Sequence, residues 1–239
     1  MRPRSAATCR MPRAAIQSGH AYLSVSTFRF GSIEIAATVT RDAAVADAWV
    51  RGVRASHPRS APLVVGLDCK WNKQRPGTGG GGSRGGGGGG PTPAWMAPRA
   101  AVLQLYAGGG AGCLVLQLLY LARIPDALRG FLGDPRVRFV GVGVVAAARR
   151  MAADHGLVCE TPVDLEGLCD DYLGLVGVGS RRLGLKEYAK EMLDLNVQKA
   201  EGIAMSDWEK PVLEMPQIGY ACVDAYVSYR LGERVLFGR

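Results

Sequence analysis

The sequence has no C-x-x-C pair and only three histidines, which leaves little to build a zinc site. Its six cysteines are spread along the chain, and the histidines are scattered among them. Neither a zinc-binding fold nor a disulfide framework is therefore indicated. We expect the cysteines to be reduced core residues of an intracellular protein, in the nucleus, the cytoplasm or both.

Long apolar runs are also missing. No stretch reaches 18 apolar residues, and no apolar segment typical of a signal peptide precedes the cysteines, so we expect no membrane partner. Hydrophobic residues still make up 48% of the 239 residues, which is enough for the core of one sizeable domain.

Acidic residues are absent from the first 33 positions, which include five arginines. This composition fits an organellar transit peptide, but it also fits a disordered extension without a targeting role, and we favour the second interpretation. We therefore predict a disordered basic extension over residues 1–26 and one folded domain over 27–239.

The first part of the chain is strongly basic. Residues 1–156 carry a net charge of +13 and residues 157–239 carry −5, and Asp68 is the single acid between Ala48 and Pro125. A basic region around one isolated carboxylate favours a polyanionic partner, with DNA or RNA as the natural candidate. The alternative is that the charge serves solubility alone.

Hydrophobic periodicity predicts an α/β domain, with a mixed β-sheet flanked by helices on both faces. Strands are predicted at 27–30, 33–40, 63–69, 100–105, 113–119 and 137–142. Helices are predicted at 42–53, 124–132, 144–154, 163–173, 185–195 and 215–235. Residues 76–92 are almost entirely glycine and proline, and we expect them to form a disordered loop inserted within the domain.

Six short motifs follow one another along this pattern. They are VVGLDCKW at 64–71, LQL at 103–105, FVGVG at 139–143, LGL at 183–185, SDW at 206–208 and YACVD at 220–224. In content and order they resemble the DEDDy-type 3'-5' exonuclease domains, in particular the Werner-syndrome-like branch found in plants. The resemblance covers residues from about 27 to 236 and implies an RNase H-like fold.

The resemblance implies a nuclease site in which four acids hold two divalent metals, Mg²⁺ or Mn²⁺, that activate a water against the scissile phosphate. It implies that Asp68 and Asp224 are metal ligands and that Tyr220, one helical turn before Asp224, positions the water. These three residues are our candidate catalytic residues. Lys70, Trp71, Lys73 and Gln104 are our candidate nucleic-acid contacts.

Two positions depart from the family pattern. Lys70 stands where the first motif has its second acid, and Ala147 stands where the second motif has its acid. We expect Lys70 to pair with Asp68 or Asp224 and to occupy the vacated metal position. Asp154 and His155 lie two turns beyond Ala147, about 10 Å further along the helix, which is too far to replace the missing ligand.

The leading prediction is therefore a degenerate exonuclease that keeps nucleic-acid binding but has weak or no activity. One alternative is a residual one-metal exonuclease on DNA or RNA, using Mg²⁺ or Mn²⁺. The other is a protein-interaction module without a nucleic-acid role. The sequence predicts nothing about the oligomeric state.

Overall fold

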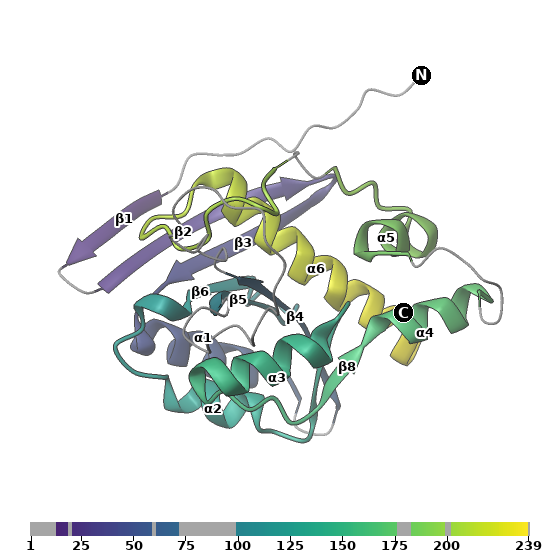
Figure 1. Cartoon of the computed structure of the whole chain (residues 1–239), viewed down its shortest axis with the longest axis horizontal. Helices are drawn as coiled ribbons and strands as arrows, with labels where there is room; N and C mark the ends of the chain where they lie inside the picture. The colour runs from purple at the N-terminus through teal and green to yellow at the C-terminus, as the bar shows by residue number, and fades with distance from the viewer. Residues whose placement is uncertain are drawn as a thin grey trace, which may run out of the picture.

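The computed structural model describes residues 13–18, 21–58, 61–71, 99–175, 183–198 and 202–238. These residues form an eight-stranded sheet with α-helices packed on both of its faces (Figure 1). The predicted mixed α/β architecture is confirmed. Lys73 and the predicted glycine-rich loop at 76–92 lie outside the described residues.

The sheet has the strand order β1-β2-β3-β6-β5-β4-β7-β8. Its strands are β1 Arg13–Ser18, β2 Ala21–Phe30, β3 Ile33–Thr40, β4 Leu63–Trp71, β5 Ala100–Tyr106, β6 Cys113–Gln117, β7 Val137–Gly141 and β8 Pro162–Asp164. Strand β5 runs antiparallel to both of its neighbours, while β7 and β8 continue parallel to β4. The antiparallel strands β1 and β2 extend the sheet beyond β3, which pairs parallel with β6.

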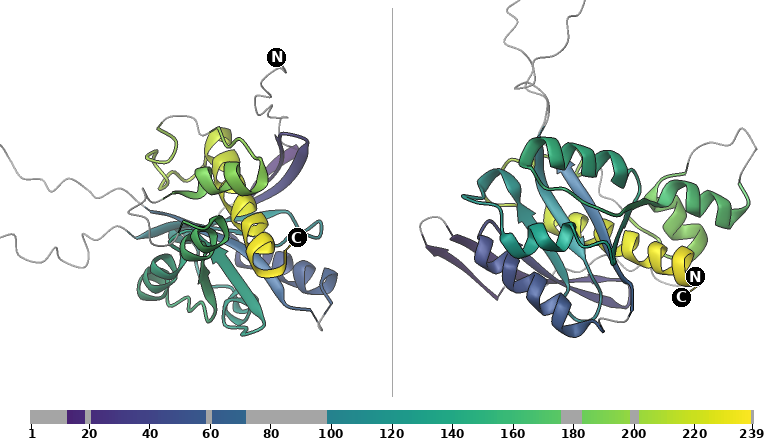
Figure 2. Two further views of the ribbon diagram at one scale, coloured as in Figure 1. Left: turned by 90° about the vertical axis from the view of Figure 1, so that its right-hand side faces the viewer. Right: turned by 90° about the horizontal axis from the view of Figure 1, so that it is seen from below.

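Two separate cores hold the helices to the sheet. Helices α1 (Ala43–Ser56), α2 (Asp126–Leu132) and α3 (Val144–His155) pack on one face. Helices α4 (Leu165–Leu173), α5 (Leu185–Leu193) and α6 (Met215–Phe237) pack on the other. The right-hand view of Figure 2 shows α1, α2 and α3 in front of the strands and α6 behind them. No described helix is both long and apolar enough to cross a membrane.

Strand β4 is buried on both faces, as its continuous apolar run predicted. Val65 and Leu67 belong to the core under α1–α3, whereas Val64 belongs to the core under α6. Asp68 and Lys70 share the face of Val64 because side chains alternate along a strand. The end of β4 therefore presents both polar side chains toward α6.

The predicted boundary at residue 26 is wrong, because the ordered strand β2 begins before it, at Ala21. Strand β2 pairs with β3 in continuous register from Leu23 opposite Thr40 to Phe30 opposite Ile33. On its inner face β2 buries Ser24 and Ser26 alongside Phe28. Two polar residues at inward positions hide the alternation of apolar residues by which a strand is usually recognised.

The predicted helix at 163–173 also needs correction. Residues Pro162–Asp164 form β8 beside β7, and α4 begins only at Leu165. The Asp164 carboxylate accepts a hydrogen bond from the Glu166 backbone nitrogen and so caps the helix. The helix begins where this cap satisfies its first amide groups.

Candidate active site

Two carboxylates and one ammonium group meet where β4 passes beneath α6. Lys70 Nζ lies 2.5 Å from Asp68 Oδ2 and 2.7 Å from Asp224 Oδ2. Asp68 and Lys70 are two residues apart on β4, and Asp224 comes from α6. Asp68 Oδ1 also accepts a hydrogen bond from the Cys69 backbone nitrogen at 2.8 Å. The lysine thus bridges both acids, where the sequence predicted a pair with Asp68 or Asp224.

Lys70 and Asp224 are well shielded from water, whereas Asp68 is partly exposed. The side chain of Lys70 is 12% exposed and that of Asp224 is 4% exposed. Burial disfavours the ammonium ion, but the nearby Asp68 and Asp224 carboxylates outweigh it and raise the pKa of Lys70 above its ordinary value. The lysine is therefore positively charged at neutral pH, and it offsets one of the two negative charges.

Two aromatic rings lie beside the lysine. Its Nζ lies 4.6 Å from the ring centroid of Tyr220 and 5.8 Å from that of Trp208. Trp208 is buried and its indole nitrogen donates to the Ala204 carbonyl, so it is a core residue. Cation–π attraction to both rings adds to the ion pairs that hold Lys70 in place.

The structure thus brings Asp68, Lys70, Tyr220 and Asp224 together. Trp208 is the contact that sequence reasoning missed as a site residue. Its signal was the SDW motif, but nothing in the sequence showed that the loop carrying this motif reaches the end of β4. Buried indoles are ordinarily core residues, so the motif alone could not assign a contact with Lys70.

Trp71 and Ala147 lie with the other core. Both pack against the apolar cluster under α1–α3, and the guanidinium carbon of Arg150 lies 4.2 Å from the Trp71 ring centroid. Ala147 is in the first turn of α3 and contributes no oxygen. The position that the resemblance assigns to the third acid is therefore apolar.

Gln104 is opposite Asp68 in the β4–β5 register, but it is fully buried. Its amide donates to the Val102 carbonyl oxygen at 3.0 Å. A nucleic acid bound at the surface would not reach this side chain. We therefore leave Gln104 out of the proposed binding surface.

Asp154 and His155 are engaged at the start of β5. Asp154 Oδ2 accepts from the Ala100 backbone nitrogen at 2.9 Å, and His155 Nε2 lies 2.7 Å from the Ala100 carbonyl oxygen. Burial lowers the pKa of His155, which favours its neutral form and a donated hydrogen bond to that carbonyl. These two residues tie α3 to the sheet and supply no ligand to the Asp68 cluster.

The residues at the site do not fit a divalent metal. Throughout the described part of the chain, no group of three or more His, Cys, Asp or Glu residues is placed to hold one. The two carboxylate oxygens that would bind it are bonded to Lys70. An ammonium group about 4 Å from a divalent ion would cost on the order of 8 kcal/mol at an effective dielectric constant of about 20.

Comparison with known proteins relates the chain to 3'-5' exonuclease domains. It is 29% identical over 191 residues to the Drosophila melanogaster exonuclease 3'-5' domain-containing protein 2, covering 78% of this chain and 27% of that protein. It is 32% identical over 121 residues to a Drosophila mojavensis 3'-5' exonuclease, covering 48% of this chain and 36% of that protein. No protein-family model matches. The chain thus spans about a third or less of the length of these relatives.

Among solved structures, Brucella melitensis NrnC aligns with a TM-score of 0.54 and 21% identity, covering 74% of this chain and 72% of that protein. A second structure of the same protein, bound to pGG, aligns with a TM-score of 0.53. These matches support the α/β fold described above. The fold is RNase H-like. This fold is consistent with the sequence similarity to exonucleases. Whether the chain can cleave a phosphodiester bond depends on the residues of the Asp68 cluster.

Proposed function

We propose that this chain is a DEDDy-type 3'-5' exonuclease domain of the Werner-like branch that binds nucleic acid without metal-dependent cleavage. The Tyr220 to Asp224 spacing on α6 and the position of Asp68 on β4 support the family assignment. The two missing acids, at the positions of Lys70 and Ala147, support the loss of catalysis. DNA or RNA is the proposed ligand.

One observation carries the proposal: the Lys70 ammonium lies between the Asp68 and Asp224 carboxylates. The nuclease chemistry that the resemblance implies needs metal ions bound by those oxygens, with an open coordination position for the phosphate. The Lys70 ammonium binds the same oxygens and offers no open coordination position. It therefore leaves the fold intact but takes the place of the metal ion that would activate water.

Nucleic-acid binding does not require the metals. Lysine and arginine side chains bind phosphates through charge, and the displaced counterions make such binding steeply dependent on salt. Arg150, at Trp71 beside the end of β4, is our candidate for such a contact, within the first 156 positions, which carry a net charge of +13. The pGG-bound structure of NrnC supports a short nucleic acid as the class of ligand to test.

The first test is an exonuclease assay on 3'-labelled DNA and RNA with Mg²⁺ or Mn²⁺. We expect no cleavage by the natural chain and metal-dependent cleavage by a Lys70→Glu, Ala147→Asp double variant. The matched control adds Asp224→Ala to the double variant and should abolish that activity. Cleavage by the natural chain that disappears in its own Asp224→Ala variant would overturn the proposal.

The second test measures binding by fluorescence anisotropy with labelled single strands over a range of salt concentrations and without metal. We expect affinity to fall steeply with salt, and Arg150→Gln to weaken binding more than Arg123→Gln. Arg123 is a fair control because it is exposed and pairs only weakly with Asp126, at 3.6 Å. No binding at moderate salt would instead favour a protein-interaction module.

A further inference from the structure

A pocket of about 280 Å³ lies at the amino-terminal ends of β4 and β7, whereas the Asp68 cluster lies toward the other end of β4. It is lined by Arg54, His57, Pro58, Ala61, Leu63, Asp134, Arg136 and Val137. Leu63 and Val137 are the first residues of β4 and β7, so five residue steps along β4, roughly 17 Å, separate the pocket from Asp68. This pocket is therefore distinct from the candidate active site.

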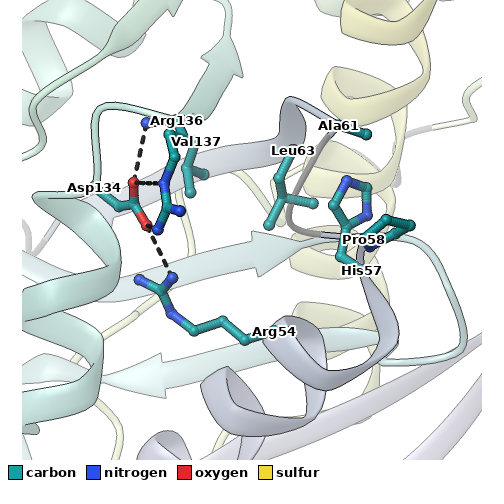
Figure 3. A pocket seen from close by; sticks show the side chains of 8 residues that line it. All are labelled: Arg54, His57, Pro58, Ala61, Leu63, Asp134, Arg136 and Val137. Carbon is teal, nitrogen blue, oxygen red and sulfur yellow. Dashed lines mark hydrogen bonds and ion pairs between the residues drawn. The ribbon is translucent and has the colours of Figure 1, made fainter.

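Two arginines converge on one buried acid in this pocket (Figure 3). Asp134 Oδ1 accepts from the backbone nitrogen and the Nε of Arg136, both at 3.0 Å. Asp134 Oδ2 accepts from Arg54 Nη1 at 2.8 Å and from Arg136 Nη2 at 2.9 Å. The three side chains carry a formal charge of +1, and Asp134 is the one acid among the described lining residues.

Asp134 also holds the guanidinium groups in fixed positions. Arg54 is held further by a hydrogen bond from Nη2 to the Gly130 carbonyl and by the Phe131 ring, whose centroid is 5.3 Å from its guanidinium carbon. Both arginines remain substantially exposed, with 40% and 64% of their side-chain area accessible, and keep N–H groups beyond those that Asp134 uses. Arginines ordered before binding lose less entropy when they bind an anion.

His57 contributes a polar atom without a partner. Its Nε2 is buried, and no described residue forms a hydrogen bond with it. Figure 3 shows the ring across the pocket from the arginines, beside Pro58 and Leu63. A buried polar atom that lacks a partner carries a free-energy cost, and a bound oxygen would remove that cost.

We propose that this pocket binds a phosphomonoester group. Arginine N–H groups match the geometry of phosphate oxygens, and the excess positive charge favours a dianion. His57 lines the opposite wall, and a turn of its ring would bring the buried Nε2 into the pocket, where it would donate to a phosphate oxygen. The buried apolar residues Leu63 and Val137 form one side of the pocket, where charged contacts are stronger than in open water. The pocket is slightly smaller than usual sites for drug-sized ligands, which suits a small group.

The ligand could be free phosphate or the phosphorylated end of a nucleic acid, which share this chemistry. The test titrates the full chain by calorimetry at constant ionic strength with inorganic phosphate, a 5'-phosphorylated dinucleotide and the same dinucleotide without its phosphate. Ring signals of the three histidines, followed by nuclear magnetic resonance, report the location. We expect saturable binding of a phosphorylated probe with a shift at His57 that the unphosphorylated dinucleotide does not cause.

Two variants test the assignment. Arg136→Gln should weaken phosphate binding about tenfold or more, since it removes charged hydrogen-bond donors. His57→Phe leaves all three ion-paired residues in place, and it should also weaken binding even if Arg136→Gln fails to fold. Arg123→Gln removes the same charge from a residue that does not line the pocket and should leave phosphate binding unchanged. No saturable binding, or binding that both pocket variants leave intact, would overturn the proposal.

The probes separate the two sources. Tighter binding of the 5'-phosphorylated dinucleotide than of inorganic phosphate would identify a nucleic-acid end as the ligand. Equal binding of both would identify the phosphate group alone. Either result supports the pocket and is independent of whether the Asp68 cluster cleaves nucleic acid.

Discussion

A Cβ atom added to Gly66 would lie 1.9 Å from the carbonyl oxygen of Ala225. Gly66 is in the middle of β4 and Ala225 is in α6, so the helix rests directly on the strand backbone at this point. Asp68 follows Gly66 by two residues, and Asp224 immediately precedes Ala225. The close crossing therefore explains how one lysine can reach both carboxylates.

Gly66→Ala should accordingly be among the most destabilising single substitutions in the domain. The clash involves backbone on both sides, so we expect the free energy of unfolding to fall by about 3 kcal/mol or more. Urea denaturation followed by circular dichroism measures the change.

Gly52→Ala is the matched control for this prediction. Gly52 lies within α1, and among the described residues no atom would come within 4 Å of its added Cβ. We expect it to stabilise the protein by about 0.5–1 kcal/mol, because alanine loses less entropy than glycine in a helix. Similar denaturation midpoints for the two variants would show that α6 does not rest on β4 as described.

The parts of this structure that follow a local rule were predictable from the sequence. The buried run at 63–69 and the i, i+2 spacing of Asp68 and Lys70 determine which strand carries the site and which side chains share its face. The YACVD motif at 220–224 predicted that Asp224 belongs to the same site, and the structure brings it to Lys70 although 154 positions separate the two residues. The prediction succeeded because the motif carried the long-range information.

Contacts between distant segments that carry no motif could not be predicted. Arg54 and Asp134 are 80 positions apart, and their contact depends on how α1 packs beside the turn before β7. Nothing in the local pattern of either segment indicates that the two residues meet. Ser24 and Ser26 led to the wrong boundary at residue 26, because their burial in β2 depends on neighbouring segments that a local pattern does not include.

Lys70→Met should destabilise the fold while keeping the volume of the side chain. It removes the charge that compensates Asp68 and Asp224, and breaking a buried ion pair costs on the order of 3 kcal/mol. Adding Asp224→Asn to Lys70→Met should cost less than the two single changes together. A double-mutant cycle from urea denaturation measures this coupling, and additive effects would show that the ammonium does not bridge the acids.

The described cysteines should react slowly with thiol reagents in the native protein. All five are free and buried, and burial raises the pKa of Cys159 and of Cys169 to about 12. We expect Ellman's reagent to titrate these thiols only after denaturant is added. A Cys9→Ser variant removes the one cysteine outside the described residues, so fast reaction of that variant would contradict the burial.

Asp134 should make stability fall at acidic pH. Hydrogen bonds from Arg136, supported by Arg54, outweigh the effect of burial and hold the pKa of this carboxyl well below its ordinary value near 4. Because the folded-state pKa is the lower one, the stabilisation is complete above about pH 4 and is lost as the pH falls toward the folded value. We expect Asp134→Asn to cost about 2 kcal/mol at pH 7, in line with charged hydrogen bonds.

The measurement is urea denaturation between pH 2.5 and 7 for the natural chain and for Asp134→Asn. The difference between them should be constant above pH 5 and should shrink steadily below pH 4, because only the natural chain has this carboxyl, which takes up a proton in the unfolded state near pH 4 but stays ionised in the folded state. Asp126→Asn is the control, since its exposed pair with Arg123 should contribute less than about 1 kcal/mol at any pH. A difference for Asp134→Asn that stays constant down to pH 2.5 would show that the two arginines stabilise the folded protein without depending on the charge of this acid.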